Sequence, residues 1–415
     1  MRPRSIGASD VSRSVHGVTT VTRDVTRDVT AEMMTRGHEQ VVFVTDVASG
    51  LRAIIAVHST ALGPALGGIR FWHYEREDDA LLDVLRLSEA MTLKASIAGL
   101  HQGGGKVVVL VDSPSAGPSA GLDAPHPESM LLALGRAIDE LGGRYLAAED
   151  VGATQGDMDV IARETPWVTG VAPASGGSGD PSPVTALGVL AAIRAVARAL
   201  DGTPDISGYR VAVQGTGHVG AHLVASLAGA GASVVVADVN EARAHAVANA
   251  HGAEVVAPDE ILSVDCDVLA PCALGGVLNE ATVPLLRCRA VCGAANNQLA
   301  DDPVDELLHA QGVLYGPDFV ANAGGIINIA EEFTGYSRDR ALARAEAIED
   351  TMTRVLERAR AVGRGPGGVA EDMARERIER EGSSKRWHPG DPAAWTNGQP
   401  LTQLRPTHVK PGSSL

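Results

Sequence analysis

The stretch from Arg210 to Gly220, RVAVQGTGHVG, constrains the fold of this chain more than any other. A β-branched run leads into glycines spaced G-x-G-x-x-G, and a helix-forming segment follows, which is the order of a dinucleotide-binding turn. Gly215 permits the tight turn, Gly217 lets the backbone approach a pyrophosphate, and Gly220 lets the helix pack on the strand. The amides at the helix N-terminus would bind the phosphates. The next strand ends at Asp238, whose carboxylate suits ribose hydroxyls and would repel a 2′-phosphate, so NAD is favoured over NADP.

Strands and helices alternate around this turn. Helices are predicted at 185–200 and 218–227 and strands at 210–214 and 233–238, a pattern typical of a doubly wound parallel sheet. Upstream, the sequence predicts a separate α/β unit with strands at 39–44, 52–58 and 106–111 and helices at 77–93 and 130–141. Between the two units, nine of the twelve residues 172–183 are Pro, Gly or Ser, which indicates a linker.

Both ends of the chain differ from this pattern. Residues 1–37 contain a repeated TRDV and residues 382–415 are rich in Pro, Gly and Ser, so both are predicted to be disordered extensions. A loop is predicted at 112–127, and one long amphipathic helix is predicted at 338–362.

Composition excludes several classes of protein. The net charge is −16, which argues against nucleic-acid and anionic-membrane partners. No run of 18 apolar residues suggests a membrane span, and the N-terminus lacks the apolar centre of a secretory signal. The four cysteines form no CxxC pair and have no histidine cluster nearby, so we expect no metal site and reduced thiols in a cytoplasmic protein.

Two lysines are candidates for chemistry. Lys106 follows Gly103–Gly105 in GLHQGGGKVVV, and Lys94 lies twelve residues upstream in MTLKAS. The glycines suit a place where a ligand or backbone comes close. Two lysines facing one pocket would lower each other's pKa, and a lysine tuned in this way can act as a general base. Spacing alone leaves two surface lysines as an alternative.

A carboxylate pair provides a third candidate. Glu149 and Asp150 follow a short apolar segment in GRYLAAEDVGAT. A carboxylate on such a turn can transfer protons. Taken alone, the segment also fits an exposed acidic turn.

A series of motifs identifies a family resemblance. It consists of GPALGGIR (63–70), MTLKASIAGLHQGGGK (91–106), AAEDVG (147–152), GDPSPVTALGV (179–189), GTGHVG (215–220), PCALGG (271–276), CGAANNQL (292–299) and ANAGGIIN (321–328). These motifs, in this order between about residues 38 and 381, resemble the Glu/Leu/Phe/Val amino-acid dehydrogenase family, and its valine and leucine dehydrogenases most of all.

The resemblance implies an architecture. It implies an N-terminal α/β domain for substrate binding and oligomerisation at 38–181, a cleft, and a Rossmann-like NAD-binding domain at 182–331. C-terminal helices at about 332–381 would complete the first domain, with the long helix returning to it. Homo-oligomers are expected.

The resemblance also implies a reaction and residue roles. An L-amino acid would be oxidatively deaminated, reversibly, to a 2-oxo acid, ammonia and NADH, with hydride passing from Cα to the nicotinamide. By this resemblance Lys94 binds the substrate α-carboxylate, Lys106 takes a proton from the attacking water, Asp150 transfers protons, and Gly103–Gly105 let the substrate lie against the backbone. Cofactor contacts are implied for Ser182, Thr185, Gly215, Thr216, Gly217, His218, Val219, Gly220, Asp238, Asn240, Ala294, Asn296 and Asn297.

The expected substrate has a branched aliphatic side chain. Substrate contacts are implied for Leu66, Gly67, Gly68, Ala148, Asn322, Ile326 and Ile329. Leu66 stands where glutamate dehydrogenases place a lysine, and a buried carboxylate without a partner is costly, so glutamate is a poor substrate prediction. Leucine dehydrogenases tend to carry valine at the positions of Ile326 and Ile329, so a smaller pocket favours valine over leucine and isoleucine.

Departures from the family pattern and alternative functions stay open at this point. Gln102, beside the glycines, stands where relatives usually have Leu, and could alter substrate fit. One alternative is a dehydrogenase of phenylalanine or another aromatic amino acid. Another is a catalytically silent NAD-binding sensor of the same fold.

Overall fold

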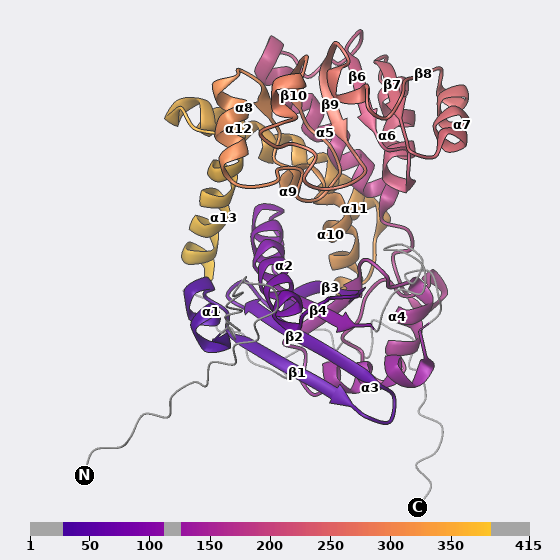
Figure 1. The fold of residues 1–415 in the computed structure, drawn as a ribbon, viewed down its shortest axis with the longest axis vertical. Coiled ribbons are helices and arrows are strands. Elements are labelled where there is room, and N and C mark those ends of the chain that lie inside the picture. Colours follow the sequence, from indigo (N-terminus) through magenta and orange to yellow (C-terminus); the bar gives the residue numbers. More distant parts are fainter. Residues whose placement is uncertain (1–27, 112–125, 383–415) are drawn as a thin grey trace, which may run out of the picture.

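The computed structural model describes residues 28–111 and 126–382, which form two α/β domains (Figure 1). The predicted fold class is confirmed. The N-terminal domain contains a mixed sheet in the order β1-β2-β4-β3-β5, in which β3 is parallel to both of its neighbours. Its strands are β1 (Gln40–Asp46), β2 (Leu51–Ser59), β3 (Ala65–Trp72), β4 (Gly103–Leu110) and β5 (Tyr145–Glu149).

The second domain contains a six-stranded parallel sheet in the order β11-β10-β9-β6-β7-β8. Chain order diverges on the two sides of β6, so the β6/β9 boundary is the topological switch point, where α/β sheets bind ligands beyond their carboxyl ends. The strands are β6 (Arg210–Gln214), β7 (Ser233–Ala237), β8 (Glu254–Val255), β9 (Cys266–Pro271), β10 (Cys288–Val291) and β11 (Leu314–Tyr315).

Thirteen α-helices complete the described residues. The N-terminal domain holds α1 (Val29–Arg36), α2 (Glu77–Ile97), α3 (Glu128–Asp139) and α4 (Gln155–Ile161). The rest are α5 (Ser182–Asp201), α6 (His218–Gly229), α7 (Glu241–His251), α8 (Pro303–Ala310), α9 (Asp318–Ala321), α10 (Gly324–Ala330), α11 (Arg338–Glu346), α12 (Ile348–Val362) and α13 (Pro366–Gly382). Short 3-10 turns lie at Pro173–Ser175, Ile261–Ser263, Val283–Leu285 and Glu331–Thr334.

The C-terminal helices differ from the prediction. The single helix expected at 338–362 is divided at Ala347 into α11 and α12. Helix α12 packs on α5 in the second domain, and it is α13 that runs back to the N-terminal domain (Figure 1). There Arg377 donates to the carbonyl oxygens of Ser96 and Leu100 at 2.7 and 2.9 Å. Helix α13 is therefore the segment that returns the chain to the N-terminal domain. Residues 383–415, which follow it, lie outside the described residues.

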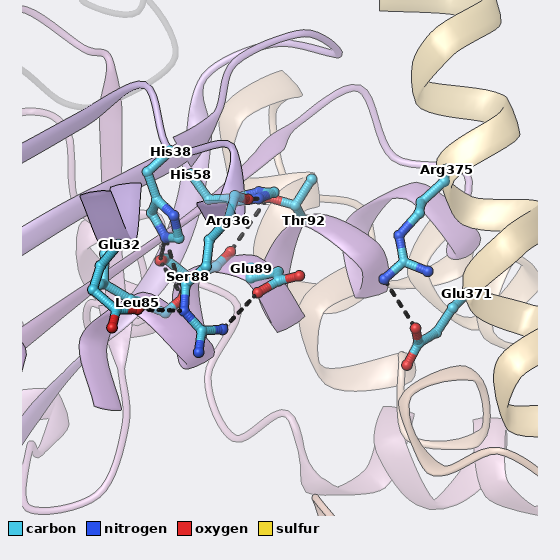
Figure 2. Close-up of polar contacts among 10 residues, drawn as sticks. All are labelled: Glu32, Arg36, His38, His58, Leu85, Ser88, Glu89, Thr92, Glu371 and Arg375. Carbon is cyan, nitrogen blue, oxygen red and sulfur yellow. Dashed lines mark hydrogen bonds and ion pairs between the residues drawn. The ribbon is translucent and has the colours of Figure 1, made fainter. Parts of the chain in front are cut away.

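The expectation of disorder up to residue 37 is wrong for residues 28–37, because α1 is anchored there; residues 1–27 lie outside the described residues. Asp28 caps the helix by accepting from the Ala31 amide at 3.1 Å. Arg36 pairs with Glu89 of α2 at 3.2 Å, and its carbonyl oxygen accepts from His58 Nε2 at 3.0 Å (Figure 2). These contacts tie α1 to both α2 and β2.

The buried His38 and the half-buried His58 lie inside this junction (Figure 2). The rings of His38 and His58 meet edge to face at 4.7 Å, and His38 Nε2 lies 2.8 Å from Ser88 Oγ. Burial, followed by the neighbouring His58, lowers the pKa of His38 to about 4. His38 is therefore neutral near pH 7 and acts as a hydrogen-bonding core residue.

Helix α5 is long and apolar enough to cross a membrane, by length and composition alone. However, 67% of its apolar stretch is buried, and its buried residues belong to the core of the second domain. The packing of the core accounts for the hydropathy of this helix.

In the N-terminal domain, helix α2 packs directly on β4. The strand begins three residues before the predicted start at 106, so Gly103–Gly105 belong to it and are fully buried. A Cβ atom on Gly104 would lie 2.1 Å from the Thr92 amide nitrogen. Only glycine at this position lets α2 approach β4 so closely, and the approach brings Lys94 and Lys106 to one side of the domain.

This contact predicts an asymmetry between two glycine substitutions. Gly104→Ala should lower the free energy of unfolding by about 2 kcal/mol or more, because the backbone of α2 must shift to admit the methyl group. Gly229→Ala, where nothing lies within 4 Å of the added Cβ, should change it by less than about 0.5 kcal/mol. Urea unfolding of both variants tests this, and equal stabilities would contradict the packing argument.

Candidate active site

A cavity of about 360 Å³ lies between the two domains. Its lining from the N-terminal domain includes both candidate lysines and the candidate aspartate. The whole lining contains both predicted catalytic residues, Lys106 and Asp150. It also contains most of the predicted substrate residues, namely Gly68, Lys94, Ala148, Asn322, Ile326 and Ile329. From the predicted cofactor set it contains Thr185, Val219, Ala294, Asn296 and Asn297.

The buried Lys106 and the half-buried Asp150 form an ion pair in the lining of the cavity. Lys106 Nζ lies 2.8 Å from Asp150 Oδ2, and Arg70 Nε donates to the same oxygen at 2.9 Å. Burial would raise the pKa of Asp150, but the two cations outweigh it and hold that pKa at about 2. Burial also lowers the pKa of Lys106, although the Asp150 carboxylate opposes the change. Asp150 is thus an anion at neutral pH, and Lys106 loses its proton more readily than an ordinary lysine.

Lys94 reaches across the cavity from α2 to the second domain. Its Nζ donates to Asn296 Oδ1 at 2.9 Å, and Asn322 Nδ2 donates to the same oxygen at 2.9 Å. Burial lowers the pKa of Lys94 to about 8, with Asp318 opposing and Lys106 adding to the shift. The lysine therefore presents a cation to the cavity at neutral pH and links the two domains.

The glycine triplet has a different role from the one expected. The space beside Gly103 is filled by the Ser59 carbonyl oxygen, that beside Gly104 by Thr92, and that beside Gly105 by the Tyr145 ring. These residues make room for protein, not for substrate. Gly68, by contrast, does line the cavity, and an added Cβ there would lie 2.5 Å from Asp150 Cβ and 3.2 Å from Lys106 Nζ, so this glycine makes room for the ion pair.

The remaining wall of the cavity includes aliphatic side chains from Ala148, Ile326 and Ile329. Leu66, Gly67 and Gln102 do not line the cavity. Leu66 is wholly buried two residues before Gly68, on the same face of β3, and belongs to the same apolar cluster as Ile326. Leu66 therefore lies behind the cavity wall, and it affects the shape of the cavity by packing and not by direct contact.

The turn after β6 has the geometry that a dinucleotide requires. Gly215 has φ +99°, and a Cβ on Gly220 would lie 2.0 Å from the Gly215 carbonyl oxygen, so neither position accepts a side chain. Beside Gly217, by contrast, nothing lies within 4 Å. This open position precedes α6, whose N-terminus has no side-chain cap. The residues present therefore fit a pyrophosphate bound to the free amides of the helix.

Other members of the predicted cofactor set follow the carboxyl ends of β6 and β7. Asp238, directly after β7, accepts hydrogen bonds from the amides of Thr216 and Asn240 at 2.7 and 2.8 Å. Asn297 has φ +52°, an uncommon conformation for a non-glycine residue. Outside the cavity itself lie Ser182, Gly215, Thr216, Gly217, His218, Gly220, Asp238 and Asn240.

Sequence reasoning missed two charged residues of the cavity, Arg70 and Asp318, and named a third, Glu149, only as one of a pair of candidates for proton transfer. Arg70 holds Asp150 in place, and its position two residues after Gly68 on one strand face was an available signal. Asp318 is buried and accepts from the Gln298 amide at 2.8 Å, and burial raises its pKa. The family resemblance assigns the proton-transfer role to Asp150; burial, followed by the neighbouring Glu332, raises the pKa of Glu149 to about 7.

Comparison with known proteins identifies the family. Residues 38–167 match the Glu/Leu/Phe/Val dehydrogenase dimerisation domain, and residues 176–363 match the Glutamate/Leucine/Phenylalanine/Valine dehydrogenase family. The chain belongs to the Glu/Leu/Phe/Val dehydrogenase family. The predicted resemblance is confirmed, and the chain is an amino-acid dehydrogenase of a dinucleotide-dependent family.

Individual relatives of this dehydrogenase carry different substrate names. It is 47% identical over 341 residues to the leucine dehydrogenase of Bacillus cereus, covering 82% of this chain and 91% of that enzyme. It is 46% identical over 345 residues to the valine dehydrogenase of Streptomyces virginiae, covering 82% and 94%. Among solved structures, L-tryptophan dehydrogenase from Nostoc punctiforme superposes with a TM-score of 0.75 at 38% identity, covering 85% and 99% of the two chains.

The ion pair between Lys106 and Asp150 predicts how stability depends on pH. The pKa of Asp150 is lower in the folded protein than in the unfolded chain, so its contribution is present above about pH 4 and is lost as pH falls towards 2. Asp150→Asn should therefore lower the free energy of unfolding by about 2 kcal/mol at pH 7, and the difference from wild type should shrink between pH 4 and pH 2. Denaturant unfolding across this range measures it.

The matched control is an exposed ion pair. Asp372 pairs with Arg364 at 2.8 Å on the surface of the protein. Asp372→Asn should change stability by less than about 1 kcal/mol at any pH, because exposed pairs are well solvated. A similar loss of stability in both aspartate variants would contradict the argument that the Lys106–Asp150 pair contributes more to stability than an exposed pair.

Proposed function

We propose that this protein is an NAD-dependent branched-chain amino-acid dehydrogenase that prefers L-valine and also accepts leucine and isoleucine. The products are the 2-oxo acid, ammonia and NADH, and the reaction is reversible. One observation carries the proposal: Lys94, Lys106 and Asp150 converge on one cavity that is also lined by aliphatic side chains and by Val219 of the dinucleotide turn. The names of the leucine and valine dehydrogenase relatives support the same substrate class.

The charged residues divide the work of binding and proton transfer. Lys94 is a cation at neutral pH and, in the proposal, holds the substrate α-carboxylate. Lys106 in its neutral form takes a proton from the water that attacks Cα, as a general base. Asp150 lies 2.8 Å from Lys106 Nζ, close enough to pass protons between that amine and the substrate nitrogen.

The cofactor supplies the redox chemistry. A bound nicotinamide dinucleotide provides the hydride acceptor for the substrate Cα. The glycine turn at Gly215–Gly220 would hold its pyrophosphate. The predicted cofactor residues that line the cavity are Thr185, Val219, Ala294, Asn296 and Asn297. Asp238 supports NAD over NADP because a carboxylate pairs with ribose hydroxyls.

The wider setting is also a proposal. We place the protein in the cytoplasm as a homo-oligomer with no nucleic-acid or membrane partner. The match of residues 38–167 to a dimerisation domain supports self-association. Four free cysteines and a net charge of −16 support the compartment and the lack of polyanionic partners.

Substrate preference is tested by a panel of amino acids. We expect kcat/KM with NAD to be highest for L-valine and lower for L-leucine and L-isoleucine. L-phenylalanine, L-tryptophan and L-glutamate should be much poorer substrates. Ile329→Val adds about one methylene of space and should move the ratio towards leucine by about 10-fold or more. A preference for phenylalanine or tryptophan would support the aromatic alternative, which the tryptophan dehydrogenase similarity makes worth including.

The base is tested by removing the amine from the cavity. Lys106→Met keeps much of the side-chain volume and should lower kcat by about 100-fold or more, because general-base catalysis is lost. NADH binding, followed by fluorescence, should stay within about threefold, since Lys106 belongs to the other domain.

The control for this experiment is Arg354→Met on the exposed side of α12, which should leave turnover unchanged. Full activity in Lys106→Met would refute the assigned role. If the wild type binds NADH but forms none with any amino acid of the panel, the protein is a dinucleotide-binding sensor instead.

A further inference from the structure

The acidic residue that selects the cofactor is already engaged within the protein. Asp238 Oδ2 accepts from the Thr216 amide at 2.7 Å and from the Thr216 hydroxyl at 3.0 Å. Asp238 Oδ1 accepts from the Asn240 amide at 2.8 Å. Both carboxylate oxygens thus have partners before any ribose arrives.

A fourth group, Arg243, covers the same carboxylate. It lies in the first turn of α7, and its Nη2 donates to Asp238 Oδ1 and Oδ2 at 2.8 and 2.9 Å, while Nε donates to Oδ2 at 3.2 Å. The Asp238 side chain is only 4% exposed, whereas that of Arg243 is 47% exposed. The group that meets solvent at this place is therefore the guanidinium.

The pairing changes the electrostatics on which NAD selectivity depends. An isolated carboxylate repels a 2′-phosphate, but a carboxylate paired with a guanidinium has no net charge. Ribose hydroxyls must share or displace the hydrogen bonds of Arg243 to reach Asp238. A phosphate, by contrast, meets a planar donor fork of the kind that binds phosphate oxygens well.

We propose that Arg243 lets the adenosine end of this site bind a 2′-phosphate, so that NADP is accepted alongside NAD. Asp238 still favours the unphosphorylated ribose, and Arg243 limits how strongly it does so. The inference rests on the proposed function only in that the turn after β6 binds a dinucleotide.

Binding of two adenosine fragments tests the proposal without catalysis. Calorimetry should show that the wild type binds adenosine 2′,5′-bisphosphate within about 10-fold of its affinity for adenosine 5′-monophosphate. Arg243→Ala should weaken the bisphosphate by about 10-fold or more, because a charge-assisted contact to phosphate is lost. The monophosphate should bind the variant equally well or more tightly.

Two further variants separate this role from a structural one. Arg243→Lys keeps the charge but not the planar fork, and should retain part of the bisphosphate affinity. Arg210→Ala removes a different ion pair of the same domain, the one between Arg210 and Glu254. It should leave the ratio of the bisphosphate affinity to the monophosphate affinity unchanged. The proposal is overturned if the wild type rejects the bisphosphate, or if Arg243→Ala leaves the ratio as it is in the wild type.

Turnover then separates this inference from the proposed function. With an amino acid that is oxidised, Arg243→Ala should raise the NAD-to-NADP ratio of kcat/KM by about 10-fold or more. If no amino acid is oxidised with either cofactor but the fragment affinities behave as expected, the proposed function fails and the role of Arg243 stands. Turnover with NAD and an unchanged cofactor ratio in Arg243→Ala would overturn the role of Arg243 alone.

Discussion

The seating of α2 on β4 is the constraint on which the rest of the catalytic domain depends. The Thr92 backbone occupies the space where a Gly104 side chain would lie, so helix and strand meet at backbone distance. Two residues after Thr92 comes Lys94, and two residues after Gly104 comes Lys106. The period of the strand returns Lys106 to the face of Gly104. The close contact therefore fixes α2 against β4, and Lys94 from the helix and Lys106 from the strand both line one cavity.

Placing two cations together has an electrostatic cost that the surrounding carboxylates offset. Asp150 is held by Lys106 and Arg70, and Arg70 in turn donates to Asp83 at 3.0 Å. Burial lowers the pKa of both lysines, and the nearby carboxylates limit that shift. The balance gives one lysine that is charged at neutral pH and another that can lose its proton. These are the two states that the proposed chemistry needs.

The second domain completes the cavity. Its position relative to the first domain is fixed by several chain segments that cross between the two. Glu332 accepts from the amides of Gly170 and Ser178 at 3.2 and 2.9 Å, which joins the two crossing segments. Helix α13 returns to the C-terminal end of α2 (Figure 1). The hydrogen bond from Lys94 to Asn296 spans the same gap from inside the cavity. These contacts therefore hold the glycine turn after β6 at a defined distance from the two lysines.

The sequence by itself determined the parallel sheet, the glycine turn with Asp238, and the candidate roles of Lys94, Lys106 and Asp150. These follow from local periodicity and from residue types in a recognisable order. Only the tertiary structure decided that the glycine triplet makes room for neighbouring protein segments and not for substrate, and that Leu66 backs the cavity wall. It also decided that residues 338–362 form two helices, and that Arg70 and Arg243 engage the two key aspartates. Such facts depend on which distant segments meet in space, and local sequence patterns do not encode the distance between them.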